Sequence, residues 1–272
     1  MSKAPIESLF TAAARCLAEP DPEQKLALTE QTATAWQTGR LSPDATQAAA
    51  TTETAGLPAQ LELVPPRQLV ARKLSSRDGR AAMIHAVAHI EFNAINLAWD
   101  AVQRFRDMPG EFYEDWIRVA VEEATHFGLL RERLRDLGHD YGDFPAHNGL
   151  WEMAQRTAHD PLIRMALVPR VLEARGLDVT PGMIARFEAA DDPETASRLR
   201  IILRDEVGHV AAGSRWLRSL CEARGLEPRS HYFSLLDQYM TGEIRGPLNL
   251  ADRRRAGFDE EELERLQARC QR

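Results

Sequence analysis

Two short stretches with the same spacing decide the fold: VEEATHF at residues 121–127 and RDEVGHV at residues 204–210. Each stretch places a glutamate three residues before a histidine. Residues three apart lie on the same face of an α-helix, so the two side chains of each pair point in one direction. Apolar residues at helical spacing surround both pairs, which predicts that these faces are buried. The pairs are Glu123 with His126 and Glu206 with His209.

A single glutamate on each of two further helical stretches completes the pattern. Glu91 lies in HAVAHIEFNAINLAWD at residues 85–100, and Glu173 lies in VPRVLEARGLD at residues 168–178. Both glutamates are on the apolar side of a predicted helix. A carboxylate in that position must be ion-paired or bound to a metal, because burying its charge alone is costly.

The order of these elements along the chain repeats one helix pair. Glu91 and Glu123 are 32 residues apart, and Glu173 and Glu206 are 33 apart. Two helices of about 20 residues joined by a short turn give this separation. Facing helices of a bundle lie about 8–10 Å apart, so all six side chains can meet in one layer. The predicted metal ligands are Glu91, Glu123, His126, Glu173, Glu206 and His209.

Four carboxylates and two imidazoles are a suitable ligand set for two first-row metal ions. The negative charges offset the metals, and the imidazoles complete each site. One Glu-x-x-His occurs by chance on any charged helix, whereas two of them with two more core glutamates form a specific pattern. The alternative is a set of ion-paired core charges without metal. We expect two iron ions, and a Mn/Fe or Mn/Mn pair stays open.

An acidic residue precedes each Glu-x-x-His pair, namely Glu122 and Asp205. Metal-bound histidines usually donate their second N–H group to a carboxylate. We therefore expect Asp205 to accept from His126, and Glu122 to accept from His209, as supporting residues of the catalytic centre. The alternative for Glu122 is that it faces solvent or Arg118, one turn earlier.

Other polar residues near these stretches have simpler interpretations. His85 and His89 lie off the ligand face, and we expect packed or surface residues rather than ligands. Arg170 and Arg175 flank Glu173, where ordinary salt bridges are expected and binding of an anionic substrate is the alternative. Core or interface aromatic residues are predicted at Trp99, Trp116, Trp151 and Trp216.

The chain contains no convincing strand pattern, so an all-α fold is predicted. We expect residues 1–60 to form an N-terminal helical segment and connector, and residues 61–272 to form the bundle with a C-terminal helical arm. The third long helix should break near residues 159–161 and stop at Gly176. We expect helices within residues 1–50, followed by an irregular connector over residues 48–76. The helices predicted after the connector span about residues 77–105, 111–137, 150–175, 181–190, 193–224, 228–243 and 259–270.

Composition excludes several classes of protein. The 272 residues are 44% hydrophobic, which is enough for a proper core, and the net charge is −7. This charge argues against a nucleic-acid partner. No apolar run approaches the roughly 20 residues of a membrane span, and the N-terminus is a poor signal peptide. We expect a cytoplasmic protein. Its three cysteines are far apart and predict neither a disulfide framework nor a zinc site.

The sequence resembles a known family. Residues from about 62 to 262 resemble an uncharacterised bacterial family of ferritin-like proteins, a domain of unknown function. More distantly, the chain is similar to bacterial tRNA hydroxylases that use a di-iron centre on the same fold. The resemblance implies an up-down four-helix bundle and its metal ligands, but no substrate. It is carried by HAVAHIEFNAINLAWDAV, EFYEDWIRVAVEEATHF, LGHDYGDFPAHNGLW, LEARGLDVTPGM, LRDEVGHVAAGSRW and GPLNLADRRRAGF.

These observations predict an oxygen-activating di-iron oxidase or hydroxylase. Its partners would be O₂, an electron donor and an organic substrate, either a small metabolite or a modified nucleoside. The alternatives are a ferroxidase or peroxidase without an organic substrate, and a binding protein that keeps the metal for stability. A helix that stops at Gly176 would open one side of the site, which favours an enzyme over an iron store. The oligomeric state stays open, with a homodimer as one option.

Overall fold

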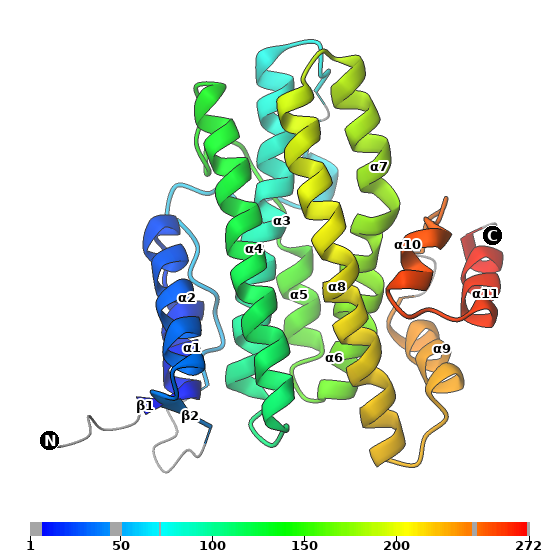
Figure 1. The fold of residues 1–272 in the computed structure, drawn as a ribbon. Helices are drawn as coiled ribbons and strands as arrows, with labels where there is room; N and C mark the ends of the chain where they lie inside the picture. Colours follow the sequence, from blue (N-terminus) through cyan, green and yellow to red (C-terminus); the bar gives the residue numbers. More distant parts are fainter. Residues whose placement is uncertain (1–6, 44–50, 71, 241–243, 271–272) are drawn as a thin grey trace, which may run out of the picture. The chain divides into compact units, whose positions relative to one another are not determined.

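The computed structural model describes residues 7–43, 51–70, 72–240 and 244–270. The described chain is mostly helical, which confirms the all-α prediction. It divides into two compact units, residues 1–151 and residues 152–272 (Figure 1). Helix α5, Gly149–Arg156, begins in the first unit and ends in the second.

The first unit contains two long helices and two shorter ones. The long helices lie side by side, α1 packs against α3, and α2 packs against α4 (Figure 1). Residues 1–60, which we set apart as an N-terminal segment, lie in this unit. The long helices match their predicted bounds to within one residue. The four helices are α1 (Leu9–Ala18), α2 (Pro22–Gln37), α3 (Arg77–Arg104) and α4 (Gly110–Asp136).

Local chemistry sets the ends of the long helices. The Ser76 hydroxyl accepts a hydrogen bond from the Gly79 backbone N–H at 3.0 Å and so caps the start of α3. Gly138 follows α4 with a φ of +76°, a conformation that suits glycine. Before α3, the described part of the connector forms only the 3₁₀ turn η1, Pro66–Gln68. This confirms the predicted irregular connector for those residues.

One small element of the first unit was not predicted. Strands β1 (Glu7–Ser8) and β2 (Leu41–Ser42) form a parallel pair. Each strand has two residues, which is too short to show alternating hydrophobicity.

The second unit is built around α8, which contacts α6, α7 and the π-helical segment η2. The predicted break near residues 159–161 is confirmed, and Asp160 caps α6 just after it; Asp192 caps α8. A short helix, α10, lies in the segment that we expected to be an arm. The elements are α6 (Pro161–Leu167), η2 (Val168–Glu173), α7 (Ala174–Ala189), α8 (Pro193–Ala223), α9 (Pro228–Tyr239), α10 (Leu250–Arg255) and α11 (Glu260–Cys270).

The predicted helix stop at Gly176 is wrong. Helix α7 continues through Gly176 and Pro181 to Ala189. Proline lacks the N–H that would bond to the carbonyl four residues earlier, here that of Leu177. The Asn249 side-chain amide donates to this carbonyl at 3.1 Å and replaces the missing bond. The irregularity lies instead in η2, before Glu173, where Pro169 interrupts the helical hydrogen bonds.

Helix α8 approaches η2 closely at a glycine. A Cβ atom on Gly213 would lie 2.3 Å from Cγ of Pro169, which is far inside van der Waals contact. A Cβ atom on Gly176 of α7 would have no other atom within 4 Å. The first glycine is therefore required by packing, and the second is not.

This difference predicts opposite effects of alanine at the two glycines. Gly213→Ala should lower the free energy of unfolding by about 1–3 kcal/mol through overpacking. Gly176→Ala should raise it by about 0.5–1 kcal/mol, because alanine favours a helix interior. Urea unfolding of both variants measures the two effects. A Gly213→Ala protein as stable as the wild type would disprove the close packing of α8 on η2.

A buried lysine joins three helices of the first unit. Lys25 of α2 is fully buried, and its Nζ donates to the Cys16 and Leu17 carbonyls and to Asn96 Oδ1, at 2.9, 3.0 and 2.6 Å. It thereby satisfies carbonyls at the end of α1. Burial lowers the pKa of Lys25 from 10.5 to about 7, while the surrounding groups raise it only in part.

Lys25 should therefore make stability depend on pH. Between pH 7 and 10.5 the unfolded chain holds the Lys25 proton more tightly than the folded chain, so stability rises with pH. From pH 7 to pH 9 the wild type should gain about 2 kcal/mol relative to Lys25→Met. Urea unfolding at both pH values measures this, with the exposed Lys73→Met as control. Equal pH dependence in the wild type and Lys25→Met would contradict the lowered pKa.

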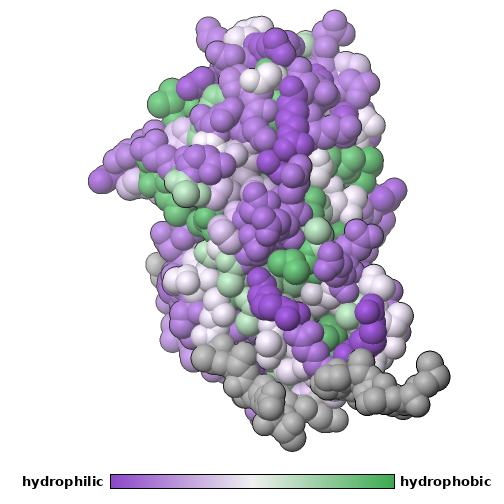
Figure 2. All heavy atoms as spheres, turned by 90° about the vertical axis from the view of Figure 1, so that its left-hand side faces the viewer, coloured by the Kyte–Doolittle hydropathy of each residue, from purple (hydrophilic) through white to green (hydrophobic). Residues whose placement is uncertain are grey.

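The surface in Figure 2 is dominated by hydrophilic side chains, and hydrophobic ones form separate small areas between them. Within the described residues, every helix is too short or too polar to cross a membrane.

Candidate metal centre

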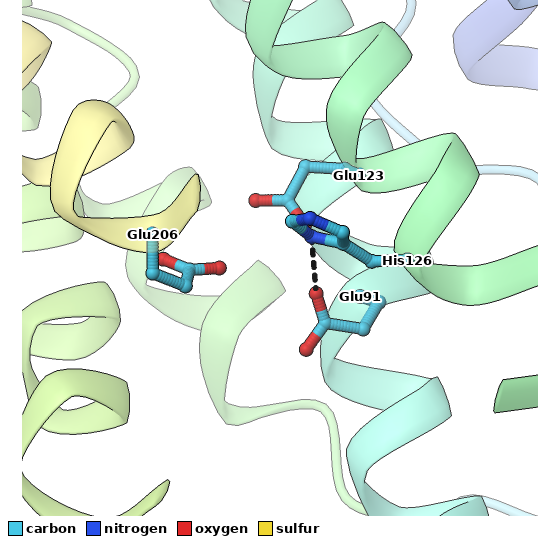
Figure 3. A group of neighbouring side chains, drawn as sticks. All are labelled: Glu91, Glu123, His126 and Glu206. Atoms are coloured by element: carbon cyan, nitrogen blue, oxygen red, sulfur yellow. Dashed lines mark hydrogen bonds and ion pairs between the residues drawn. The ribbon is translucent and has the colours of Figure 1, made fainter. Parts of the chain in front are cut away.

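The first unit brings three of the six predicted ligands together. Glu91 projects from α3, and Glu123 and His126 project from α4 (Figure 3). His126 Nδ1 lies 3.3 Å from Glu123 Oε2 and 3.4 Å from Glu91 Oε2. The ligand atoms of all three residues lie within 4.8 Å of one another, and the residues are at most 3% exposed. This is the expected geometry for donors that share a cation.

Charge explains how two carboxylates can be buried here. Burial alone would lower the pKa of His126, but Glu123 and Glu91 raise it to about 11. Without metal, His126 is therefore protonated and supplies the positive charge that the carboxylates need. A metal ion can take over this role, since a neutral imidazole is a metal ligand. Binding would then release the proton.

The second unit carries the matching set. Glu206 and His209 lie on one face of α8, with His209 Nδ1 3.6 Å from Glu206 Oε1. Glu173 is the last residue of the π-helical segment η2. Its side chain is buried, as are those of Glu206 and His209. Each unit thus presents one buried glutamate and one buried Glu-x-x-His pair.

The donor set fits a metal. In the first unit Glu91, Glu123 and His126 are buried and could bind a metal ion, and Glu206 of the second unit, also drawn in Figure 3, is a buried donor of the same kind. Carboxylates and imidazole suit iron, manganese or zinc, so these residues alone do not select one metal.

The π-helical geometry around Glu173 was not predicted. Such segments are rare and occur mostly at functional sites. The signal in the sequence is Pro169, four residues before Glu173. It removes one backbone donor, so the helix widens in the turn that carries the glutamate.

The two acidic residues that precede the ligand pairs have contacts in their own units. Glu122 accepts hydrogen bonds from Arg118, with one guanidinium nitrogen 3.3 and 3.2 Å from its two carboxylate oxygens. This contact agrees with the alternative interpretation of Glu122. Asp205 accepts from the neighbouring Arg204. The pairings of Glu122 with His209 and of Asp205 with His126 stay predictions.

His85 and His89 are packed residues, as predicted. His85 Nε2 accepts from the Gly142 backbone N–H at 2.9 Å, and His89 Nδ1 lies 2.7 Å from the Tyr141 hydroxyl. Burial lowers the pKa of both histidines to about 4, so both are neutral. They attach the loop after α4 to α3.

Tyr141 is a buried residue that sequence reasoning missed. Its ring lies 5.0 Å from those of Phe92 and Phe127, which neighbour Glu91 and His126 in sequence. Burial raises its pKa. It therefore remains protonated and forms an aromatic cluster with Phe92 and Phe127 in the core of the first unit.

Arg170 forms a salt bridge, as expected. Its Nη2 lies 2.9 Å from both carboxylate oxygens of Glu262, and both side chains are buried. The four tryptophans predicted as core residues are also buried.

The chain matches a family model over residues 18–264, and that family is described as "Protein of unknown function (DUF455)". The chain belongs to this family. It is also similar to an "Uncharacterized protein" of Haemophilus influenzae, 48% identical over 217 residues that cover 77% of this chain and 75% of the relative. No solved structure matches. Family membership confirms the predicted resemblance to an uncharacterised family and leaves the activity to be argued from the site.

Proposed function

We propose that this DUF455 protein is a ferritin-like di-iron oxidase or hydroxylase that uses O₂ to oxidise a small organic substrate. In this proposal the chain folds as an up-down four-helix bundle, as its sequence predicts, and the two buried ligand sets hold two metal ions. The observation that carries the proposal is the repetition of one buried Glu and one Glu-x-x-His pair in each unit.

Charge supports the assignment of two ions rather than one. Four carboxylates bring a charge of −4 into one layer, and two divalent ions balance it. In the metal-free first unit, a proton on His126 offsets only one of its two negative charges. Glu173 and Glu206 of the second unit bring two further negative charges, and in this proposal a second cation balances them.

Iron leads among the metals because it supplies electrons to O₂ when reduced. The residues of the chain would hold the metals, exclude water and shape access for the substrate. Phe92, Phe127 and Tyr141 form an aromatic cluster in the unit that holds Glu91 and His126, which keeps this part of the core apolar.

The test loads the metal-free protein with Fe²⁺ under anaerobic conditions, adds O₂ and follows O₂ consumption together with bound iron. An oxidase should consume O₂ in proportion to protein and keep its iron bound. A ferroxidase should instead oxidise a large excess of Fe²⁺ over many turnovers. That second result, or no O₂ consumption by the loaded protein, would contradict the proposed function. A positive result would justify a search for the substrate by incubation with cell metabolites and nucleosides.

A further inference from the structure

A cavity in the second unit, separate from the metal ligands, is lined by apolar side chains together with several arginines. Its volume is about 140 Å³, and it opens beside η2 and α7. One acidic residue, Asp178, lies among the charged residues that line it. The four basic residues that line it are Arg170, Arg175, Arg245 and Arg253.

Two of these arginines are neutralised by acidic residues. The Arg253 guanidinium forms a bidentate pair with Asp178, at 2.9 and 2.7 Å. Arg170 pairs with Glu262 at 2.9 Å. Both pairs are buried, and in each pair the charge of the carboxylate is offset by the charge of its own arginine.

The other two arginines carry positive charge that the described residues of this unit do not offset. Arg175 Nη1 donates to the Arg245 carbonyl at 2.6 Å, which holds the two residues together. In the described ranges, no acidic side chain forms a salt bridge with either guanidinium. The cavity therefore has an excess of positive charge at its Arg175 and Arg245 side.

Arg170 forms a fixed part of the cavity wall. It is 1% exposed, and its guanidinium lies between the Tyr232 and Phe258 rings, at 4.4 and 4.2 Å from their centres, which fixes its orientation. Its Nε is buried and has almost no accessible surface, so Arg170 adds positive charge to the wall without presenting this N–H to a ligand.

We propose that this cavity binds the phosphate group of a small ligand. Arg175 and Arg245 would supply both the charge and the hydrogen-bond donors, and Arg170 would form a fixed, positively charged part of the wall. Planar guanidinium groups bind phosphate oxygens by paired, charge-assisted hydrogen bonds. The volume accommodates a phosphate ion or a phosphate monoester group with little room beyond it, given about 30 Å³ per water. The site uses none of the six metal ligands and does not depend on the proposed oxidase activity.

Isothermal titration of the metal-free full-length protein with inorganic phosphate tests this site. The wild type should show one saturable site at constant ionic strength. Arg175→Gln with Arg245→Gln should weaken binding at least about tenfold. Arg186→Gln, an exposed arginine also on α7, should bind phosphate like the wild type. If the double variant does not unfold cooperatively, Arg245→Gln alone carries the test, because that side chain is exposed.

Absence of saturable binding in the wild type, or equal weakening in the Arg186→Gln control, would overturn the proposal. A second titration with methyl phosphate distinguishes the two sources of the ligand. Binding as tight as that of inorganic phosphate indicates the phosphate end of an organic molecule, and weaker binding indicates the free ion. Because the measurement needs no metal, its outcome is independent of whether the metal centre forms.

Discussion

The Glu123→Gln protein should bind iron at least about 100-fold more weakly than the wild type. Glu123 is fully buried, and its carboxylate lies 3.3 Å from His126, so it supplies both charge and a ligand atom to the first unit. Glutamine keeps the volume of the side chain but removes the charge. Changes even to outer residues of metal sites cost 10–100-fold in affinity, and loss of a ligand should cost at least as much. Equilibrium dialysis with elemental analysis measures the affinity.

Glu114→Gln is the matched control for this experiment. Glu114 lies on the same helix, α4, but is exposed. Its substitution removes the same charge from the chain and should leave iron affinity unchanged. If both variants bind iron equally well, Glu123 is no ligand and its burial needs another explanation. Circular dichroism confirms that both variants remain helical.

Arg253→Met should lower the free energy of unfolding by about 3–5 kcal/mol. Arg253 of α10 and Asp178 of α7 form a buried pair, with side chains 4% and 1% exposed. Removal of the arginine leaves the Asp178 charge buried, although the Asn249 backbone N–H still donates to its Oδ1 at 2.9 Å. Urea unfolding of the two proteins measures the loss.

The neighbouring residue provides the control. Arg254, also on α10, pairs with Glu260, and both side chains are about half exposed or more. Exposed pairs contribute about 0–1 kcal/mol, so Arg254→Met should change stability little. A similar small loss in Arg253→Met would show that α10 is not held to α7 by the buried pair.

Much of the helical framework follows from local sequence. Asp192 before Pro193 predicts the start of α8, and Gly138 predicts the end of α4, because caps and turns depend on neighbouring residues. The buried ligand faces follow from the spacing of Glu123 and His126 among apolar residues. The residues of each pattern lie within one or two helical turns, so the pattern can be recognised in the sequence without the tertiary structure.

Other features depend on residues far away in the chain. Helix α7 continues past Pro181 because Asn249, 72 residues after Leu177, donates to the Leu177 carbonyl. In the sequence Lys25 resembles a surface lysine, whereas in the fold it is bonded to Asn96 and to the end of α1. The π-helical turn that carries Glu173 has a local signal in Pro169, but the packing of Pro169 against Gly213 has none. No local pattern encodes such long-range contacts, and the contact with Asn249 explains why the predicted helix stop at Gly176 is wrong.

The irregular feature beside Glu173 is a π-helical turn and not the helix end that the sequence predicted. The expected opening at Gly176 does not exist, since α7 is continuous there. Instead, Glu173 lies at the end of the π-helical turn Val168–Glu173, and such turns are frequent at functional sites.

We propose that each unit contributes one Glu and one Glu-x-x-His pair to a centre of two metal ions. This can be tested with crystals of the iron-loaded protein, measured at wavelengths on both sides of the iron absorption edge. Two anomalous peaks about 3.5–4 Å apart are expected, one beside His126 and the other beside His209. A single peak, or peaks away from these histidines, would contradict it.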